Sequence, residues 1–254
     1  MPIHDWSRVD AGLFHDFHQT WTINIRNVLN GGLLPRGYSA LVEQHAGGVV
    51  LDVIGLQSAV REEPPVGWEG GTVVTMNPPK TTYVIESEAE TYAARGNRIT
   101  IRHPLGRVVC VMEIVSPGIK SGSSALRALV KKTLEFLERG IHLLIVDLFP
   151  PSVRDPQGIH KAIWDEMEDR PFALEGNRNR TLVAYVAGMP VRAFVEPIGV
   201  GETLPDMPAY LDRDSYVPVP LESTYQSAWS SCPLEMRRLI ETGPHPASAE
   251  NGGG

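Results

Sequence analysis

Two carboxylates stand inside apolar segments, where an isolated charge would be costly. Glu113 lies near the end of Val108–Val115, in which seven of the eight residues are apolar, and Asp52 interrupts the apolar run VVLDVIGL. An ionised carboxylate is expensive to bury unless it is paired, hydrogen-bonded or bound to a metal. Each residue is therefore either half of a structural salt bridge or a ligand in an active site.

Convergence of Asp52 and Glu113 in one sheet would form a metal site. Oxygen ligands without sulfur favour Mg²⁺ or Mn²⁺ over zinc. Such an ion activates water and neutralises charge on a phosphodiester, and a nearby ammonium group assists it. Glu43, on a preceding predicted strand, is a further candidate ligand, with a solvent-facing strand residue as the alternative.

The helix predicted after Glu113 offers the ammonium group. Lys131 and Lys132 lie on opposite borders of its apolar arc, which comprises Leu126, Leu129, Val130, Leu134 and Leu137. Lys131 has Glu135 and Glu138 beside it, so Lys132 is the preferred candidate, with a solvated helix edge as the alternative. Lys120, in the loop directly after the strand, is the second candidate.

The segments around Glu113 form a predicted strand–helix–strand unit. Val108–Val115 and Ile141–Phe149 are near-continuous apolar runs, and a helix from Ser123 or Ser124 to about Arg139 separates them. This pattern is typical of a parallel crossover connection. Asp147, near the end of the second strand, is expected to be a strand-end residue rather than a ligand.

The remaining elements complete an α/β chain. Before this unit we expect one helix, a β-hairpin and two further strands, which make a meander leading into the Glu113 strand: Gly12–Asn30, Tyr38–Gln44 with Val49–Leu56, Thr81–Ile85 and Arg98–His103. After it we expect a short helix, a hairpin, a proline-rich loop and a final helix: His160–Met167, Thr181–Ala187 with Val191–Ile198, and Leu221–Thr242.

Composition indicates a globular protein. The 254 residues are 42% hydrophobic, enough for a packed core, and we expect a single α/β domain over residues 1–242, with a core at about 12–150, a C-terminal decoration at about 151–242 and a disordered tail at 243–254. Two cysteines, no signal peptide and no membrane-length apolar run favour a cytoplasmic protein.

Charge limits the partners that the surface can attract. A net charge of -7 excludes a positive field over the whole surface, so any contact with DNA must be local. The basic residues around one predicted hairpin form a candidate strip for such a contact: Arg95, Arg98, Arg102 and Arg107. The partners considered are DNA and, in a homodimer, a second copy of the chain; no membrane contact is expected.

Several blocks carry a family resemblance. The segments HDWSRVDAGLFHDFHQTW, VLNGGLLPRGY, MEIVSPGIK and LEFLERGIHLLIVDL resemble the bacterial family catalogued as domain of unknown function (DUF) 4058, over most of the chain. The MEIVSPGIK block, a lysine on the next helix, and Gly140, His142 and Asp147 are also similar, over part of the chain, to Uma-type proteins of the PD-(D/E)XK nuclease-like superfamily.

The superfamily resemblance implies a restriction-endonuclease-like αβββαβ core with a mixed central sheet. It also implies a Mg²⁺-dependent phosphodiesterase site made by Asp52, Glu113 and a lysine. Val115 stands where that superfamily usually has its lysine, and the Uma-type pattern moves the lysine to Lys132. The expected function is therefore a Mg²⁺-dependent nuclease or nuclease-like protein acting on DNA. A noncatalytic binding or assembly module that keeps the fold is the alternative.

Overall fold

The computed structural model describes most of the predicted core. The described residues are 3–9, 11–43, 83–87, 98–121 and 123–242, with the backbone alone described for 83–87, 121, 123 and 242. Four of the predicted features lie outside them: Asp52, the predicted strand Val49–Leu56, Arg95 and the tail 243–254.

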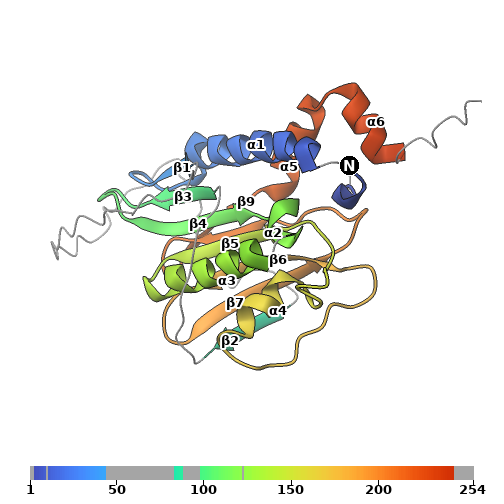
Figure 1. Ribbon diagram of the computed structural model, residues 1–254. Helices are drawn as coiled ribbons and strands as arrows, with labels where there is room; N and C mark the ends of the chain where they lie inside the picture. The colour runs from blue at the N-terminus through green and yellow to red at the C-terminus, as the bar shows by residue number, and fades with distance from the viewer. Residues whose placement is uncertain (1–2, 10, 44–82, 88–97, 122, 243–254) are drawn as a thin grey trace, which may run out of the picture.

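A seven-stranded mixed sheet forms the centre of the molecule (Figure 1). Its strands are β1 (Ser39–Glu43), β2 (Tyr83–Ser87), β3 (Arg98–Arg102), β4 (Val108–Ile114), β5 (His142–Asp147), β6 (Arg180–Val186) and β7 (Val191–Ile198), in the spatial order β1-β3-β4-β5-β6-β7-β2. The pair β4–β5 is parallel, and the other neighbouring pairs of these described strands are antiparallel. The fold class is therefore mixed α/β, as predicted.

Helices cover both faces of this sheet (Figure 1). The described helices are α1 (Ala11–Val28), α2 (Pro117–Ser121), α3 (Ser123–Glu138), α4 (Gly158–Trp164), α5 (Leu221–Ser231) and α6 (Leu234–Thr242). Helices α1 and α5 pack together on one face, while α3 and α4 cover the other. Two hydrophobic cores result, one on each side of the sheet.

The predicted crossover unit is confirmed. Parallel β4 and β5 are joined through α2 and α3, with Glu113 paired in register with Ile145. Helix α3 ends at Glu138, and Gly140 follows with φ of 73°, a left-handed conformation that glycine adopts at low cost. The apolar runs of both strands are buried because helices or the second sheet cover each face.

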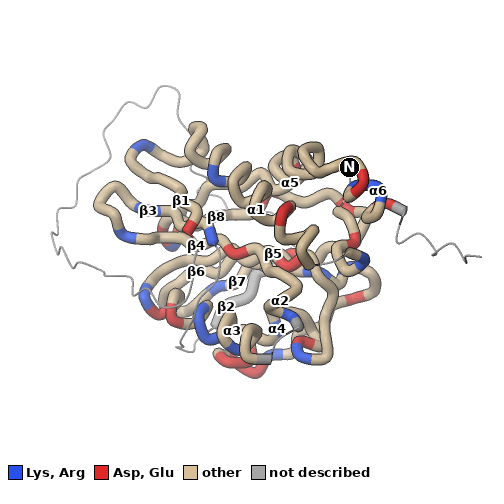
Figure 2. Tube along the Cα trace, turned by 45° about the horizontal axis from the view of Figure 1, so that its top comes forward, with Lys and Arg blue, Asp and Glu red and all other residues tan. Residues whose placement is uncertain are grey.

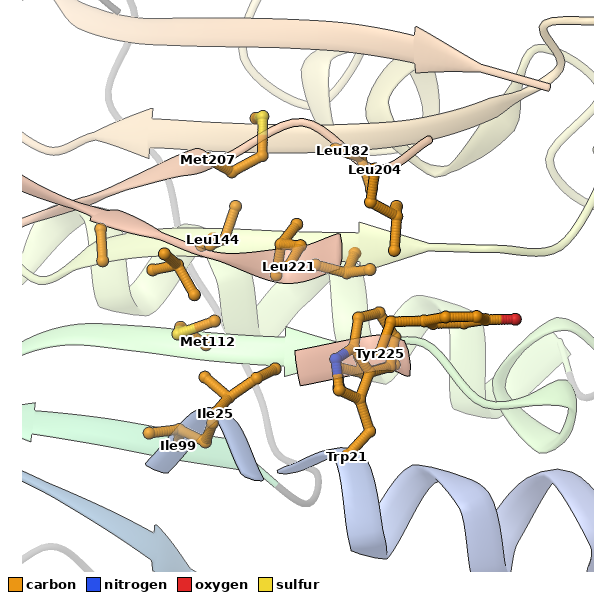
Figure 3. Packing of buried hydrophobic residues seen from close by; sticks show 14 of the residues in the cluster. Trp21, Ile25, Ile99, Met112, Leu144, Leu182, Leu204, Met207, Leu221 and Tyr225 are labelled. Carbon is orange, nitrogen blue, oxygen red and sulfur yellow. The ribbon is translucent and has the colours of Figure 1, made fainter. Parts of the chain in front are cut away.

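Large side chains fill the core between α1, α5 and the sheet. Trp21 and Ile25 of α1 lie with Tyr225 of α5 over Ile99 and Met112 of the sheet (Figure 3). The heptad-like spacing of apolar residues on α1 faces this core, as its sequence predicts. A two-stranded sheet, β8 (Met207–Tyr210) and β9 (Tyr216–Val219), completes the same layer.

The N-terminal segment is tied into this core through one tyrosine hydroxyl. The oxygen of Tyr225 lies 2.8 Å from Nδ1 of His4 and accepts hydrogen bonds from Nε1 of Trp6 at 3.0 Å and the His4 backbone N–H at 3.2 Å. The His4 ring stacks on Trp229 with ring centroids 3.7 Å apart. Residues at opposite ends of the chain therefore share one buried polar contact.

Three predictions about the periphery are wrong. Strand β2 pairs with β7 at the edge opposite β1, so it is not part of the meander. The proline-rich loop contains the β8–β9 hairpin, in which Pro208 and Pro218 are opposite each other and a two-stranded sheet leaves their missing N–H groups at its edges. The final helix is two helices, because Cys232 is extended before Pro233.

Tyr225→Phe should lower the free energy of unfolding by about 1–3 kcal/mol, because it removes the acceptor of buried N–H groups of Trp6 and His4. Denaturant unfolding of both proteins measures the difference. Tyr38→Phe, which removes a hydroxyl from a half-buried tyrosine outside this network, is the matched control. Equal loss in the two variants would mean that the Tyr225 hydrogen bonds add no stability of their own.

Candidate functional site

Glu113 lies on the face of the sheet that α3 covers. Alternation along β4 directs Cys110, Met112 and Ile114 into the core under α1, and Val111 and Val115 into the core under α3. Glu113 belongs to the second set and is only 2% exposed. An apolar strand between two covered faces thus carries one carboxylate, at its end and on the α3 side.

Lys132 of α3 contacts that carboxylate. Its Nζ lies 3.0 Å from Oε1 and 2.9 Å from Oε2 of Glu113, and its side chain is 1% exposed. The solvated helix edge considered for Lys132 is therefore wrong, because the lysine lies under the helix; Lys131, one residue earlier, is exposed. The structure brings Glu113 and Lys132 together as a buried ion pair.

Lys120 belongs to a different cluster. Its Nζ lies 2.8 Å from Oδ2 of Asp147 and 2.8 Å from Oδ2 of Asp155, and it donates hydrogen bonds to the carbonyl oxygens of Phe149 and Pro150. The side chain is 7% exposed. Lys120 therefore serves as the counter-ion at the end of β5, in contrast to the role as charge stabiliser beside Glu113 that its position in the sequence suggested.

Asp147 is the last residue of β5, as the sequence predicts, and lies on the same face of the sheet as Glu113. Burial raises the pKa of its carboxyl group to about 6, a shift that the Lys120 ammonium and the Phe149 backbone N–H oppose and that the Asp155 carboxylate reinforces. Burial thus outweighs the attraction of Lys120, and Asp147 binds a proton more readily than an aspartate in water.

Glu43 faces cations of the neighbouring strand. Its Oε1 accepts hydrogen bonds from Arg102 Nη2 at 2.6 Å and Thr100 Oγ1 at 3.0 Å, and its Oε2 lies 3.6 Å from Arg98 Nε. Burial raises the pKa of Glu43, but the Arg102 and Thr100 hydrogen bonds and both guanidinium charges lower it further, for a net decrease. Glu43 is half-buried and ion-paired, so neither a solvent-facing residue nor an open metal ligand describes it.

The predicted arginine strip is wrong for Arg98. This residue is 3% exposed, and its guanidinium carbon lies 4.9 Å from the ring centroid of Phe136 on α3. Strand β3 lies between β1 and β4, and Phe136 of α3 covers the Arg98 side chain. Arg102 pairs with Glu43, and Arg107 is exposed in the turn before β4.

The described residues therefore carry a row of alternating charges across the sheet. Arg98 precedes Ile99, which pairs with Met112, so Arg98 and Glu113 are next to each other across β3 and β4. The row runs from Glu43 through Arg98 and Glu113 to Lys132. Over the whole described chain, basic and acidic residues are interspersed along the tube (Figure 2).

The fit to a divalent metal can be tested on the carboxylates of this row. Glu113 has the hard oxygen donors that Mg²⁺ prefers, whereas the oxygens of Glu43 already face Arg98, Arg102 and Thr100. No group of three or more His, Cys, Asp or Glu side chains that could hold a metal occurs among the described residues. Asp52, the expected second ligand, lies outside them.

Sequence reasoning missed Arg98 as a buried charge and Asp155 altogether. The alternation in RITIR was a usable signal, because it assigns Arg98, Thr100 and Arg102 to the face opposite Ile99 and Ile101. Asp155 had no such signal. It reaches Lys120 because the loop after β5 turns back, with Ser152 and Asp155 forming an isolated β-bridge.

Asp147→Asn should remove a pH dependence from folding. A carboxyl whose pKa rises to about 6 on folding stabilises the folded state below its ordinary pKa and loses that contribution as pH rises through about 6. Relative to Asp147→Asn, the free energy of unfolding of the native chain should therefore fall by about 3 kcal/mol between about pH 3.5 and 7. Denaturant unfolding across this range measures it. Asp165→Asn, at an exposed ion pair with Lys161, should leave the profile unchanged.

Comparisons with protein-family models, curated proteins and solved structures found no match in any of the three. Among the described helices, none has the length and apolar composition required to span a bilayer. The resemblance to domain of unknown function 4058 and to the nuclease-like superfamily therefore rests on the sequence blocks.

Proposed function

We propose that this chain is a nuclease-like protein with a restriction-endonuclease-like core, whose reaction centre contains Glu113 and Lys132. The arrangement α1, β1, β3, β4, α3, β5 is compatible with an αβββαβ core, since β1, β3 and β4 are antiparallel neighbours and β5 is parallel to β4. Strand β2 is then an insertion in sequence that joins the far edge of the sheet.

The observation that carries this proposal is the contact between a strand glutamate and a lysine of the following helix. Glu113 and Lys132 are 19 positions apart in the sequence, yet their charged groups are 2.9 Å apart on one face of the crossover unit. The resemblance implies this pair as part of a phosphodiesterase site. An ammonium held on a rigid element can neutralise charge at a phosphate, and a carboxylate held on the neighbouring strand can bind the metal ion that assists it.

The residues have distinct roles in this proposal. Glu113 and Asp52 would hold Mg²⁺, which when bound supplies a Lewis acid and an activated water. Lys132 neutralises charge that develops on a phosphoryl oxygen. Both oxygens of Glu113 contact Lys132, and their remaining lone pairs are the positions at which a metal ion would bind. The proposal assigns Glu43 no role in metal binding, since its oxygens are paired with β3 arginines.

A noncatalytic binding or assembly module is the second candidate, and the burial of the pair favours it. Glu113 and Lys132 are 2% and 1% exposed, which suits a structural ion pair. The strand next to β4 carries Arg98 beside Glu113 rather than an acid. The net charge of -7 also gives DNA no general attraction, and Arg107 is the exposed member of the arginine set among the described residues.

Metal binding and cleavage separate the two candidates. We expect calorimetric binding of Mg²⁺ or Mn²⁺ that is lost in Asp52→Ala and in Glu113→Ala, together with metal-dependent cleavage of DNA. Lys132→Met should lower the cleavage rate by about 10²–10³-fold by removing a charge stabiliser, while Lys131→Met, on the exposed side of the same helix, should leave it unchanged. A folded native chain that shows neither heat nor cleavage with either ion is the noncatalytic module.

Glu113→Gln should destabilise the chain by about 3–5 kcal/mol in a chelating buffer, because it removes an anion 2.9 Å from a buried ammonium. Thermal or denaturant unfolding measures the change. Glu135→Gln, on the half-buried border of α3, is the control and should change stability by less than about 0.5 kcal/mol. An increase in stability for Glu113→Gln would instead mean that repulsion from other carboxylates dominates at this position.

A further inference from the structure

The ammonium of Lys120 lies in a cage of four oxygens. It is 2.8 Å from Asp147 Oδ2, 2.8 Å from Asp155 Oδ2, 2.8 Å from the carbonyl oxygen of Pro150 and 3.2 Å from that of Phe149. These oxygens come from the end of β5 and the loop that follows it, whereas the lysine comes from α2. The four oxygens thus belong to a different segment of the chain from the lysine that they surround.

The chain fixes both carboxylates of the cage. Oδ1 of Asp147 accepts a hydrogen bond from the Phe149 backbone N–H at 3.0 Å, and Oδ1 of Asp155 accepts one from the Ser152 backbone N–H at 3.0 Å and another from the Ser152 hydroxyl. Each carboxylate therefore keeps one oxygen on the loop and directs the other at the ammonium. Both residues are 1% exposed, so the cage is held in place by buried contacts.

The donor set and charge of this cage are those of a hard-cation site. Two carboxylate oxygens and two backbone carbonyl oxygens are the ligand types that Ca²⁺ uses in proteins. When both carboxylates are ionised, they and the ammonium carry a net charge of about -1. Without a cation, two buried carboxylates this close take up a proton, so a metal ion that replaces the ammonium binds in competition with protons.

We propose that these four oxygens form a cation site that the chain fills with its own Lys120, and that the site takes Ca²⁺ once the ammonium group is removed. In the native chain the cage is occupied and binds no metal. Metal binding by the native protein would then report on other carboxylates, so this inference is independent of the function proposed for Glu113 and Lys132.

Ca²⁺ is expected to bind in preference to Mg²⁺. Ca²⁺ accepts six to eight oxygens at about 2.3–2.6 Å in flexible geometries, whereas Mg²⁺ demands a regular octahedron at about 2.0–2.1 Å. The cage oxygens surround a nitrogen at 2.8–3.2 Å, so they have to move inward less to reach Ca²⁺ distances than to reach Mg²⁺ distances. Truncation of the lysine to alanine also leaves space for water ligands to complete the coordination.

The test is thermal unfolding of the full chain carrying Lys120→Ala, with chelator, with Ca²⁺ and with Mg²⁺. At a Ca²⁺ concentration about ten times the Kd, we expect Tm to rise by about 3–6 °C, with a smaller rise for Mg²⁺. The rise with Ca²⁺ should be larger for Lys120→Ala than for the native chain, because any response of the native chain comes from other carboxylates. If Lys120→Ala is unfolded in chelator, circular dichroism should detect refolding when Ca²⁺ is added.

Two controls assign the effect to the cage. Lys120→Met fills the space with an apolar chain and should not respond to Ca²⁺, and the double variant Lys120→Ala, Asp155→Asn should lose the response because one charged ligand is gone. A Lys120→Ala protein that neither gains thermal stability nor refolds with Ca²⁺ overturns the proposal. Equal stabilisation of Lys120→Ala and of the double variant also overturns it, because the ion would then bind elsewhere.

Discussion

The structure depends on charges buried between the sheet and α3. Moving an ion out of water costs several kcal/mol even after the protein relaxes, so each buried charge needs a partner at a fixed position. Glu113 and Lys132 satisfy this requirement across the β4–α3 contact, and Lys120 satisfies it for Asp147 and Asp155 at the end of β5. A shift of α3 by one turn would separate the first pair, so the ion pair specifies the register of the helix on the sheet.

The two faces of the sheet differ in the kinds of side chain that they bury. The face under α1 and α5 is apolar and aromatic, and its polar atoms are satisfied locally, as in the contacts of the Tyr225 hydroxyl and the hydrogen bond from Trp21 to Thr224. The face under α3 carries the charged row from Glu43 to Lys132 at one edge and a second apolar core, centred on Trp164 and Tyr185, farther along. Apolar burial thus stabilises both faces, whereas the buried ion pair of Glu113 and Lys132 lies on the α3 face alone.

Sequence periodicity predicts the parts of this fold that depend on neighbours in the chain. The apolar runs of β4 and β5, the apolar arc of α3 and Gly140 at its end each have a local signal, and these predictions are confirmed. Lys132 could be chosen over Lys131 because helical spacing places Glu135 and Glu138 beside Lys131, and because the Uma-type resemblance implies Lys132. The positions of Glu113 and Lys132 in the fold follow from those local patterns.

Other features depend on non-local pairing, for which the chain carries no local pattern. The composition of strand β2 predicts a strand but does not say which strand it pairs with, and it pairs with β7 at the far edge of the sheet. The prolines of β8 and β9 indicated a loop, although two-stranded sheets tolerate proline. Asp155 meets Lys120 only because the loop after β5 folds back, so no spacing rule connects residues 35 positions apart. The break between α5 and α6 is different, since Pro233 was a readable signal that the helical pattern on both sides obscured.

The buried pair of Glu113 and Lys132 can be purely structural or part of a reaction centre. The difference is whether the removal of water from the two charged groups contributes to binding of a ligand. The carboxylate and the ammonium lose their hydration when the chain folds. In a reaction centre, a phosphate would pair with the ammonium and a cation with the carboxylate, and neither protein group would have to lose more water. In a purely structural role the two groups would stay in contact, and the pair would fix the register of α3 on the sheet. Arg98, stacked on Phe136 and next to Glu113 across β3 and β4, bears on both cases, because a second cation beside the carboxylate lowers the cost of separating it from Lys132. Arg98 therefore supplies a second cation near the Glu113 carboxylate in either role.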